Sequence, residues 1–176
     1  MKKIIVFAGS NSSTSINHEL VVYASGNLQH ATVEMIRLTQ FSLPLFSEDL
    51  EREEGYPEVL RALLSKIKAA DAVLLSVNEH NGTVSAFFKN ILDWLSRIEY
   101  KFLEGKNIFL LSTSNGKRGA LSAQEYTAGV LPRFGAAEIF RFTLPSFSEN
   151  FQQGQIINHE LASQLKQQLA QFEDSI

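Results

Sequence analysis

The strongest constraint on the fold is an alternation of short apolar runs with longer segments of helical spacing, repeated along the whole chain. The runs at residues 4–8 and 72–77 are apolar at almost every position, which is typical of parallel strands buried on both faces. Segments with apolar residues at helical intervals separate these runs. This order predicts an α/β fold with a parallel sheet and helices on both of its faces.

Five strands and five helices are predicted. The strands are placed at residues 4–8, 32–38, 72–77, 108–112 and 136–142, and the helices at 16–28, from Pro57 onward, 86–98, 121–134 and 159–172. Two long irregular stretches, 39–56 and 143–158, are expected to carry function. Because no break in composition interrupts the pattern, residues 1–176 are expected to form a single domain.

The composition excludes several kinds of chemistry. The chain has no cysteine, so disulfides, thiolate nucleophiles, iron–sulfur clusters and cysteine zinc sites are all ruled out. The four histidines are scattered without the spacing of metal ligands, and no metal site is expected. Redox chemistry in this chain therefore requires a bound cofactor.

Charge and hydropathy restrict the partners. The net charge is −3 and no basic run is present, so no nucleic acid partner is expected. Only five apolar residues follow Met1-Lys2-Lys3, too few for a signal peptide, and no stretch approaches the ~18 apolar residues of a membrane span. A cytoplasmic protein without a membrane partner is expected.

The loop after the first predicted strand favours a phosphate. Small polar residues fill it from Ser10 to Ser15, including Ser12, and Ile16 and Asn17 then open a helix. Free N–H groups and a partial positive charge at a helix N-terminus favour an anion. Capping by Ser15 or Asn17 would explain one polar residue but not the whole set.

Two other nucleotide sites fit poorly. The dinucleotide fingerprint G-x-G-x-x-G is absent because Gly9 stands alone, and Arg37-Leu38-Thr39 replaces the acidic residue expected after the second strand. Gly116-Lys117 lacks the upstream glycine of a P-loop. NAD and ATP are therefore disfavoured as the tightly held ligand.

Two further loops lie at the carboxyl ends of predicted strands, where open α/β sheets bind ligands. Asn78, Glu79, His80, Asn81 and Gly82 follow the third strand, and Ser112, Ser114 and Gly116 follow or end the fourth. Glycine lets backbone approach a flat ring closely, and hydroxyl and N–H groups can meet its oxygens and nitrogens. Asn81-Gly82 is also a turn signal in its own right.

At these residues the chain resembles the NADPH-dependent FMN reductase family, which includes azo-, quinone- and chromate-reducing members. The family's first loop reads G-S-x-R-x-x-S-x-N and its second reads P-E-Y-N-G-S, followed by a helix with K-N-x-x-D-W. The matching residues are Gly9, Ser10, Ser15, Asn17, Glu79, Asn81, Gly82, Lys89, Asn90, Asp93 and Trp94. Ser12 replaces the arginine of the first loop. In the second loop, which continues as x-P-G in the family, Thr83 is a conservative replacement and the departures are Asn78, His80, Ser85 and Ala86.

The resemblance implies a flavodoxin-like three-layer sandwich with a five-stranded parallel sheet of order 2-1-3-4-5. It also implies an FMN-dependent oxidoreductase that passes hydride from NADPH or NADH to a flavin, quinone, azo compound or similar small oxidant. FMN would carry the chemistry without a catalytic side chain. The predicted cofactor-binding residues are Ser10, Ser12, Ser15, Ile16, Asn17, Asn78, Glu79, His80, Asn81, Gly82, Ser112, Ser114 and Gly116.

Two alternatives stay open on the sequence. A flavodoxin would carry electrons without being an enzyme, but its S/T-x-T-G-x-T phosphate loop does not match Ser10 to Ser15. A scaffold or regulatory protein of the same fold that has lost its flavin is consistent with the departures at Ser12 and His80. Visible absorbance of the purified protein with added FMN distinguishes these possibilities.

The helix predicted at 86–98 suggests a subunit contact. Its first ten residues, Ala86 to Leu95, carry more apolar side chains than one sheet-facing stripe requires, namely Phe87, Phe88, Ile91, Leu92, Trp94 and Leu95. A large exposed apolar patch is rare on monomers. A homodimer or a dimer of dimers formed through this helix is therefore expected.

Overall fold

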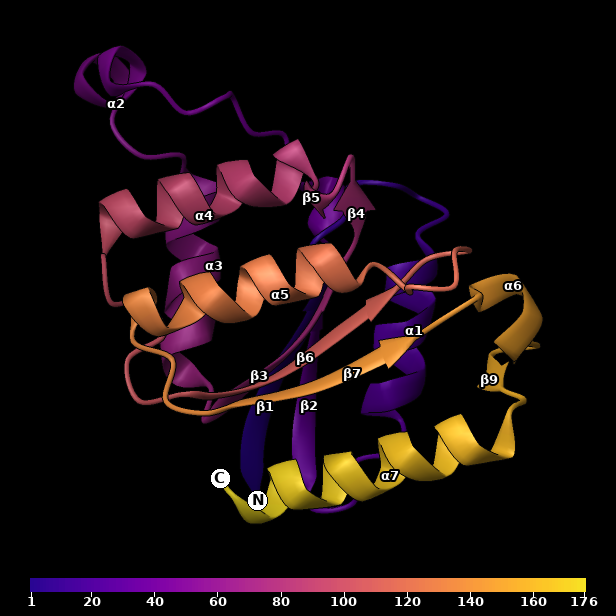
Figure 1. Cartoon of the computed structure of the whole chain (residues 1–176). Helices are drawn as coiled ribbons and strands as arrows, with labels where there is room; N and C mark the ends of the chain where they lie inside the picture. The colour runs from indigo at the N-terminus through magenta and orange to yellow at the C-terminus, as the bar shows by residue number, and fades with distance from the viewer.

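A computed structural model describes all residues 1–176 and has one five-stranded parallel sheet at its centre (Figure 1). The order across the sheet is β2 (Ala31–Ile36), β1 (Lys2–Ala8), β3 (Ala72–Val77), β6 (Asn107–Thr113) and β7 (Ile139–Leu144). Counted among the sheet strands alone, this is 2-1-3-4-5. The predicted flavodoxin-like fold is confirmed.

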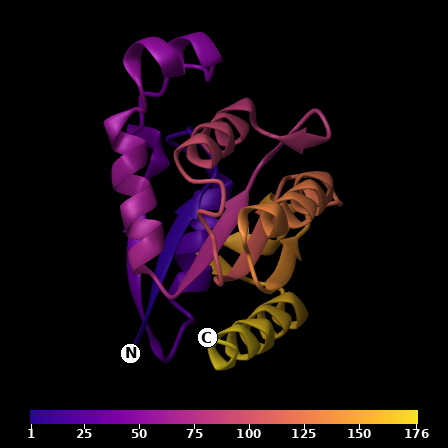
Figure 2. The same ribbon diagram turned by 90° about the vertical axis from the view of Figure 1, so that its left-hand side faces the viewer.

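Helices cover both faces of the sheet (Figures 1 and 2). One face carries α1 (Ile16–Ser25) and α7 (His159–Asp174), and the other carries α3 (Glu58–Ala69), α4 (Ala86–Ile98) and α5 (Leu121–Val130). Successive residues of a strand point to opposite faces of the sheet. Ile4 therefore packs in the core under α1 and α7, and Ile5 packs in the core under α3, α4 and α5. None of the helices is long and apolar enough to span a membrane. The cytoplasmic location stays a prediction.

The last sheet strand, β7, begins three residues later and ends two residues later than predicted. Residues 136–138 form a connection instead, since Gly135 has a φ of 95° and the Ala137 N–H donates to Lys106 O at 2.9 Å. Strand β7 then continues to Leu144, because Thr143 and Leu144 pair with the last two residues of β6. The register with β6 fixes both ends of this strand.

Other boundaries also differ from the prediction. Helix α1 ends at Ser25, three residues early, and β2 ends at Ile36, two residues early. Pro132 lies near the start of a 3₁₀ turn, η2 (Leu131–Phe134), which follows α5. The stretches predicted as irregular hold η1 (Leu38–Gln40), α2 (Glu48–Glu54), α6 (Phe147–Asn150), β8 (Phe151–Gln152) and β9 (Gln155–Ile156).

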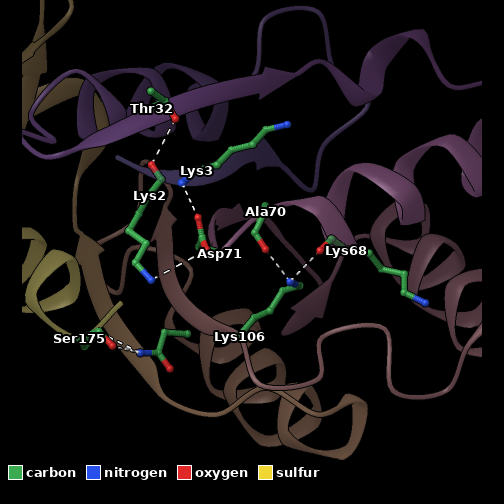
Figure 3. Close-up of polar contacts among 9 residues, drawn as sticks. Lys2, Lys3, Thr32, Lys68, Ala70, Asp71, Lys106 and Ser175 are labelled. Atoms are coloured by element: carbon green, nitrogen blue, oxygen red, sulfur yellow. Dashed lines mark hydrogen bonds and ion pairs between the residues drawn. The ribbon is translucent and has the colours of Figure 1, made fainter.

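Polar contacts link neighbouring segments at the edge of the sheet where the parallel strands begin (Figure 3). The Lys3 N–H donates to Asp71 Oδ2 at 2.7 Å and so joins β1 to the residue before β3. Lys106 donates to Ala70 O at 2.6 Å, at the C-terminal end of α3, where a cation is favoured. Burial lowers the pKa of Lys106 most, although Asp71 opposes this. The loops predicted to bind the cofactor lie at the opposite edge.

A strap, defined as residues 41–56, crosses the outer side of α4. Trp94 Nε1 and Asn90 Nδ2 both donate to Pro44 O, at 3.0 and 2.9 Å. Asn90 Oδ1 in turn accepts from the Phe46 N–H at 2.8 Å. The Phe46 ring meets Trp94 edge to face, with centroids 5.0 Å apart. These contacts tie the strap to α4, while α2 within it projects away from the sheet (Figures 1 and 2).

The strap overturns the reasoning behind the expected contact through α4. Trp94, at 0% exposure, is buried within the single chain, and so are Phe88, Ile91, Leu92 and Leu95. Phe87 is half-buried. The second apolar face of this helix is covered by the chain's own strap rather than left bare, so it does not require a partner subunit.

Trp94→Ala is expected to lower the free energy of unfolding by about 3–5 kcal/mol, because it removes a buried aromatic ring and one end of the strap's attachment. Leu45→Ala is the matched control, since Leu45 lies in the same strap but is 78% exposed. It should change stability by less than about 0.5 kcal/mol. Urea denaturation measures both values, and equal effects of the two substitutions would contradict the attachment of the strap to α4 through Trp94.

Candidate functional site

A cleft of about 240 Å³ opens where β1, β3 and β6 end, at their carboxyl edge. Twelve residues line it, and they come from the three loops that follow these strands. They are Ser10, Ser12, Thr14, Ser15, Ile16, Asn17, Asn78, Glu79, His80, Thr113, Ser114 and Asn115. The cleft lies at the edge where doubly wound folds bind ligands.

Short-range hydrogen bonds shape the first loop. Ser10 Oγ accepts from the Ser12 N–H at 3.2 Å, and Ser12 Oγ accepts from the Thr14 N–H at 3.3 Å. Ser15 Oγ caps α1 by accepting from the His18 N–H at 3.2 Å. The N–H groups of Ile16 and Asn17 stand in the first turn, where a helix supplies no partner for them. This end of α1 can therefore bind an anion.

His18 follows this loop on α1. Burial lowers its pKa most, and the positive charge of Arg37 lowers it further. Both effects favour the neutral imidazole at neutral pH. No lysine or arginine lines the cleft either, so the groups that it offers to an anion are N–H groups and hydroxyls.

Asn17 joins three elements at the base of the cleft. Its side-chain Oδ1 accepts from Ser76 Oγ at 2.8 Å and from the Thr113 N–H at 3.1 Å. Its Nδ2 donates to Thr113 O at 3.1 Å. The residue is 2% exposed. Asn17 thus fixes α1 against the ends of β3 and β6, and its amide is occupied by the protein itself.

Gly9 allows the first loop to pack closely on α4. A Cβ placed on Gly9 would lie 2.7 Å from the ring of Phe88, well inside van der Waals contact. Ser85 Oγ donates to Gly9 O at 3.1 Å and accepts from the Phe88 N–H at 3.2 Å. The first loop and the start of α4 are therefore held together at a distance that only glycine permits.

The second loop is a β-hairpin. Its strands are β4 (Glu79–His80) and β5 (Thr83–Val84), and the two residues between them, Asn81 and Gly82, have φ values of 53° and 82°. Two central residues with positive φ are typical of the type I′ turn, which Asn-Gly favours. Asn81 and Gly82 form this turn and do not line the cleft.

Glu79 attaches the hairpin to α5. Its Oε2 accepts from the Ala123 N–H at 3.3 Å, in the first turn of that helix. The residue at the N-cap position is Ala120, which has no side-chain acceptor. Glu79 therefore supplies the cap from another element, and its negative charge also suits the helix N-terminus.

Asn78 and His80 form a pair at the wall of the cleft. Asn78 Nδ2 lies 3.2 Å from His80 Nε2. The Oδ1 atom of Asn78 is buried and has no hydrogen-bond partner. Buried acceptors are normally satisfied, and this oxygen is one of two buried side-chain atoms in the chain that have no partner.

The third loop is tied to the start of α6. Ser114 O accepts from the Phe147 N–H at 3.0 Å, and Gly116 O accepts from the Ser146 N–H at 3.0 Å. Ser112 is fully buried, and its hydroxyl lies 3.2 Å from Thr143 Oγ1 and accepts from Gln124 Nε2 at 3.3 Å. Ser112 therefore links β6 to β7 and to α5, and it does not line the cleft.

The structure brings together most of the predicted cofactor-binding residues. Those that line the cleft are Ser10, Ser12, Ser15, Ile16, Asn17, Asn78, Glu79, His80 and Ser114, and those that do not are Asn81, Gly82, Ser112 and Gly116. Thr14, Thr113 and Asn115 line the cleft without having been predicted. These three residues are polar and lie in or next to the predicted loops, so the sequence offered a reason to include them.

A second, wider groove of about 500 Å³ lies beside the cleft, and His80 lines both. The groove also receives Thr83 from the hairpin, Lys89 from α4 and Tyr126 from α5. Lys89 Nζ is 2.5 Å from Asp93 Oδ1 on its own helix. The groove therefore offers aromatic, hydroxyl and ammonium groups next to the cleft.

Comparison with known proteins gives consistent matches. The model of the NADPH-dependent FMN reductase family matches residues 2–149. A quinone reductase from Escherichia coli strain K12 is 30% identical over 130 residues, covering 73% of this chain and 69% of that protein. A 2-hydroxy-1,4-benzoquinone reductase from a Burkholderia species is 33% identical over 129 residues, with the same two coverages. The flavoenzyme NAD(P)H:(acceptor) oxidoreductase from Paracoccus denitrificans has a TM-score of 0.79 at 26% identity, covering 99% of this chain and 96% of that chain.

Asn17→Ala is expected to lower the free energy of unfolding by about 3 kcal/mol or more, because it leaves buried groups of Ser76 and Thr113 without partners. Asn27→Ala is the matched control: Asn27 follows α1 and donates to Tyr23 O at 2.8 Å, but it is only partly buried. Its loss should cost about 1 kcal/mol or less. Thermal or urea unfolding measures both, and equal losses would contradict the bridging role of Asn17.

Proposed function

Because the chain belongs to the NADPH-dependent FMN reductase family, we propose that it passes hydride from NAD(P)H through FMN, held in the cleft, to a small conjugated oxidant such as a quinone. The protein is an oxidoreductase, and FMN and NAD(P)H are its cofactors. The acceptor and the path of the hydride are the proposed parts. Membership of an enzyme family favours this function over that of an electron carrier.

The observation that carries the proposal is the position and lining of the cleft. It lies at the carboxyl ends of β1, β3 and β6, and the hydroxyl-rich loop from Ser10 to Ser15 leads into the N-terminus of α1. A terminal phosphate can be bound there by N–H groups and hydroxyls. The ring would then lie toward the second and third loops.

The residues present fit FMN. Serine and threonine hydroxyls line the phosphate end, and amide and hydroxyl groups from Asn78, Thr113 and Ser114 line the other end. The Oδ1 atom of Asn78 has no partner within the protein, and the N–H donor that a flavin ring carries would satisfy it. Ser12 replaces the arginine of the family pattern, so the phosphate end has fewer positive charges.

The chain's own residues would position the cofactor and its substrates. Bound FMN supplies the hydride chemistry, and no side chain of the cleft is required as an acid or base. Asn17 and Glu79 fix the loops on which the cofactor would rest. The groove beyond His80, with Tyr126 and Lys89, would receive the nicotinamide or the flat ring of the acceptor in turn.

We expect the phosphate end to respond to charge. Ser12→Arg should tighten FMN binding about tenfold through a charge-assisted hydrogen bond, whereas riboflavin, which lacks the phosphate, should gain nothing. Quenching of flavin fluorescence measures both affinities, with FAD expected to bind more weakly than FMN. Oxidation of NADPH or NADH with a quinone should require FMN.

Other outcomes would change the assignment. An equal gain for FMN and riboflavin would mean that the first loop does not bind the phosphate. If neither FMN nor FAD bound at about tens of micromolar, the chain would instead be a flavin-free protein of this fold.

The active form proposed is a homodimer, or a dimer of dimers, that uses the strap. Leu45 lies between two strap residues that are bound to α4, and its own side chain is 78% exposed, in contrast to the buried inner residues of α4. An exposed leucine held in place on the surface suits a two-fold contact in which each strap meets the partner. The contact would therefore involve the strap rather than the inner face of α4.

Leu45→Asp should give a monomer by light scattering and reduce NAD(P)H oxidation, because a charge would be buried in the contact. The affinity for FMN should change little. Val22→Asp is the control, since Val22 is also exposed, at 45%, but lies on α1. A wild-type protein that is monomeric and active at micromolar concentration would overturn the dimer.

A further inference from the structure

A cavity of about 20 Å³ lies inside the protein, between the sheet and the helices α3 and α4. Twelve residues line it, and every one of them is hydrophobic and buried. They come from β1, α3, β3, α4, the segment that precedes β6, β6 itself and η2. We infer that this cavity is a binding site for a small apolar molecule of the size of dioxygen.

The lining determines the chemical class of the ligand. Its side chains are those of phenylalanine, leucine, isoleucine and valine, so none of them has a nitrogen or oxygen atom. A buried water normally makes about three hydrogen bonds to polar groups, and an apolar cavity stays dry for lack of them. An ion or a polar molecule would lose its hydration without compensation. Only an uncharged, apolar molecule can therefore enter at little cost.

The volume determines the size of the ligand. A cavity needs about 10–15 Å³ by this measure to hold one water molecule, and this one slightly exceeds that value. The space thus suits a single atom or a diatomic molecule rather than a flavin. Dioxygen and xenon both belong to this class, because both are apolar and small.

Contacts outside the cavity hold its walls apart. The Leu103 N–H donates to Phe134 O at 2.9 Å, and the Phe102 ring packs against the Phe134 ring with centroids 4.9 Å apart. The opposite wall belongs to β1, β3 and β6, which are fixed by their pairing in the sheet. The lining atoms therefore lack dispersion partners on the side of the void, and a guest molecule would supply them.

The cavity is close to the first loop of the cleft but separate from it. Phe88 lines the cavity, and its ring is the group that a Cβ on Gly9 would meet at 2.7 Å. The Phe88 ring thus stands between the cavity and Gly9. Because the cavity and the cleft share no lining residue, binding in the cavity does not depend on the proposed function.

The first test uses dioxygen itself, which is paramagnetic, on the protein without flavin. Nuclear magnetic resonance measures the relaxation of methyl groups under dioxygen and under nitrogen. Ile91 and Leu92, which line the cavity, should relax several times faster under dioxygen than the matched controls Val6 and Leu74, which are equally buried on the other face of the sheet. Xenon should shift the signals of the same two lining residues. Equal dioxygen effects on the lining and control methyl groups would overturn the inference.

The second test fills the cavity from two of its walls, with Val73→Ile and Leu103→Phe. Either substitution should abolish the extra relaxation at Ile91 and Leu92 while leaving Tm unchanged or higher, because the added atoms occupy free space. Val6→Ile is the control, since the same added methyl group should lower Tm in a core without that space. If both filled variants kept the full dioxygen effect, or both lost as much Tm as Val6→Ile, the inference would be wrong.

Discussion

The buried amide of Asn17 is the interaction on which the geometry of the site depends. One side chain satisfies a hydroxyl of β3 and both backbone groups of Thr113 at the end of β6. Parallel strands leave their carboxyl ends without a shared turn, so something else must hold the three loops at fixed distances. Because the amide has both a donor and an acceptor, it can bind the N–H and the C=O of the same residue. An aspartate or leucine in this place could not do so.

The fold was predictable because burial on two faces gives a strand an almost continuous apolar run, and this signal is local. The first and last residues of the strands were harder to predict from the sequence, because β7 begins and ends where its register with β6 dictates. The cover of α4 was misjudged for a related reason. The excess of apolar residues on α4 was visible in the sequence, but the partner that buries them is a strap more than thirty residues earlier, and such long-range packing leaves no periodic trace.

The loops of the site were also predictable, while the roles of individual residues were not. A hydroxyl-rich stretch before a helix predicts an anion site, and in the structure this stretch lines the cleft. The same residue types, however, also form contacts within the protein. Glu79 caps α5, Ser112 accepts a hydrogen bond from Gln124, and Asn81 forms the tight turn. Which polar atoms stay free for a ligand depends on three-dimensional partners. The buried oxygen of Asn78, for example, has no partner, and nothing in the local sequence distinguishes it from an amide oxygen that is paired.

The attachment of the strap has a practical consequence for spectroscopy. Trp94 is the chain's single tryptophan, and its indole N–H is bound to Pro44 O in a site fully shielded from water. Its emission therefore reports the surroundings of this one indole, and release of the strap from α4 would change it without contribution from any other indole. A shift of that emission to longer wavelength at unchanged far-ultraviolet circular dichroism would distinguish loosening of the strap from unfolding of the domain. The protein thus carries an intrinsic optical probe of the contact between the strap and α4.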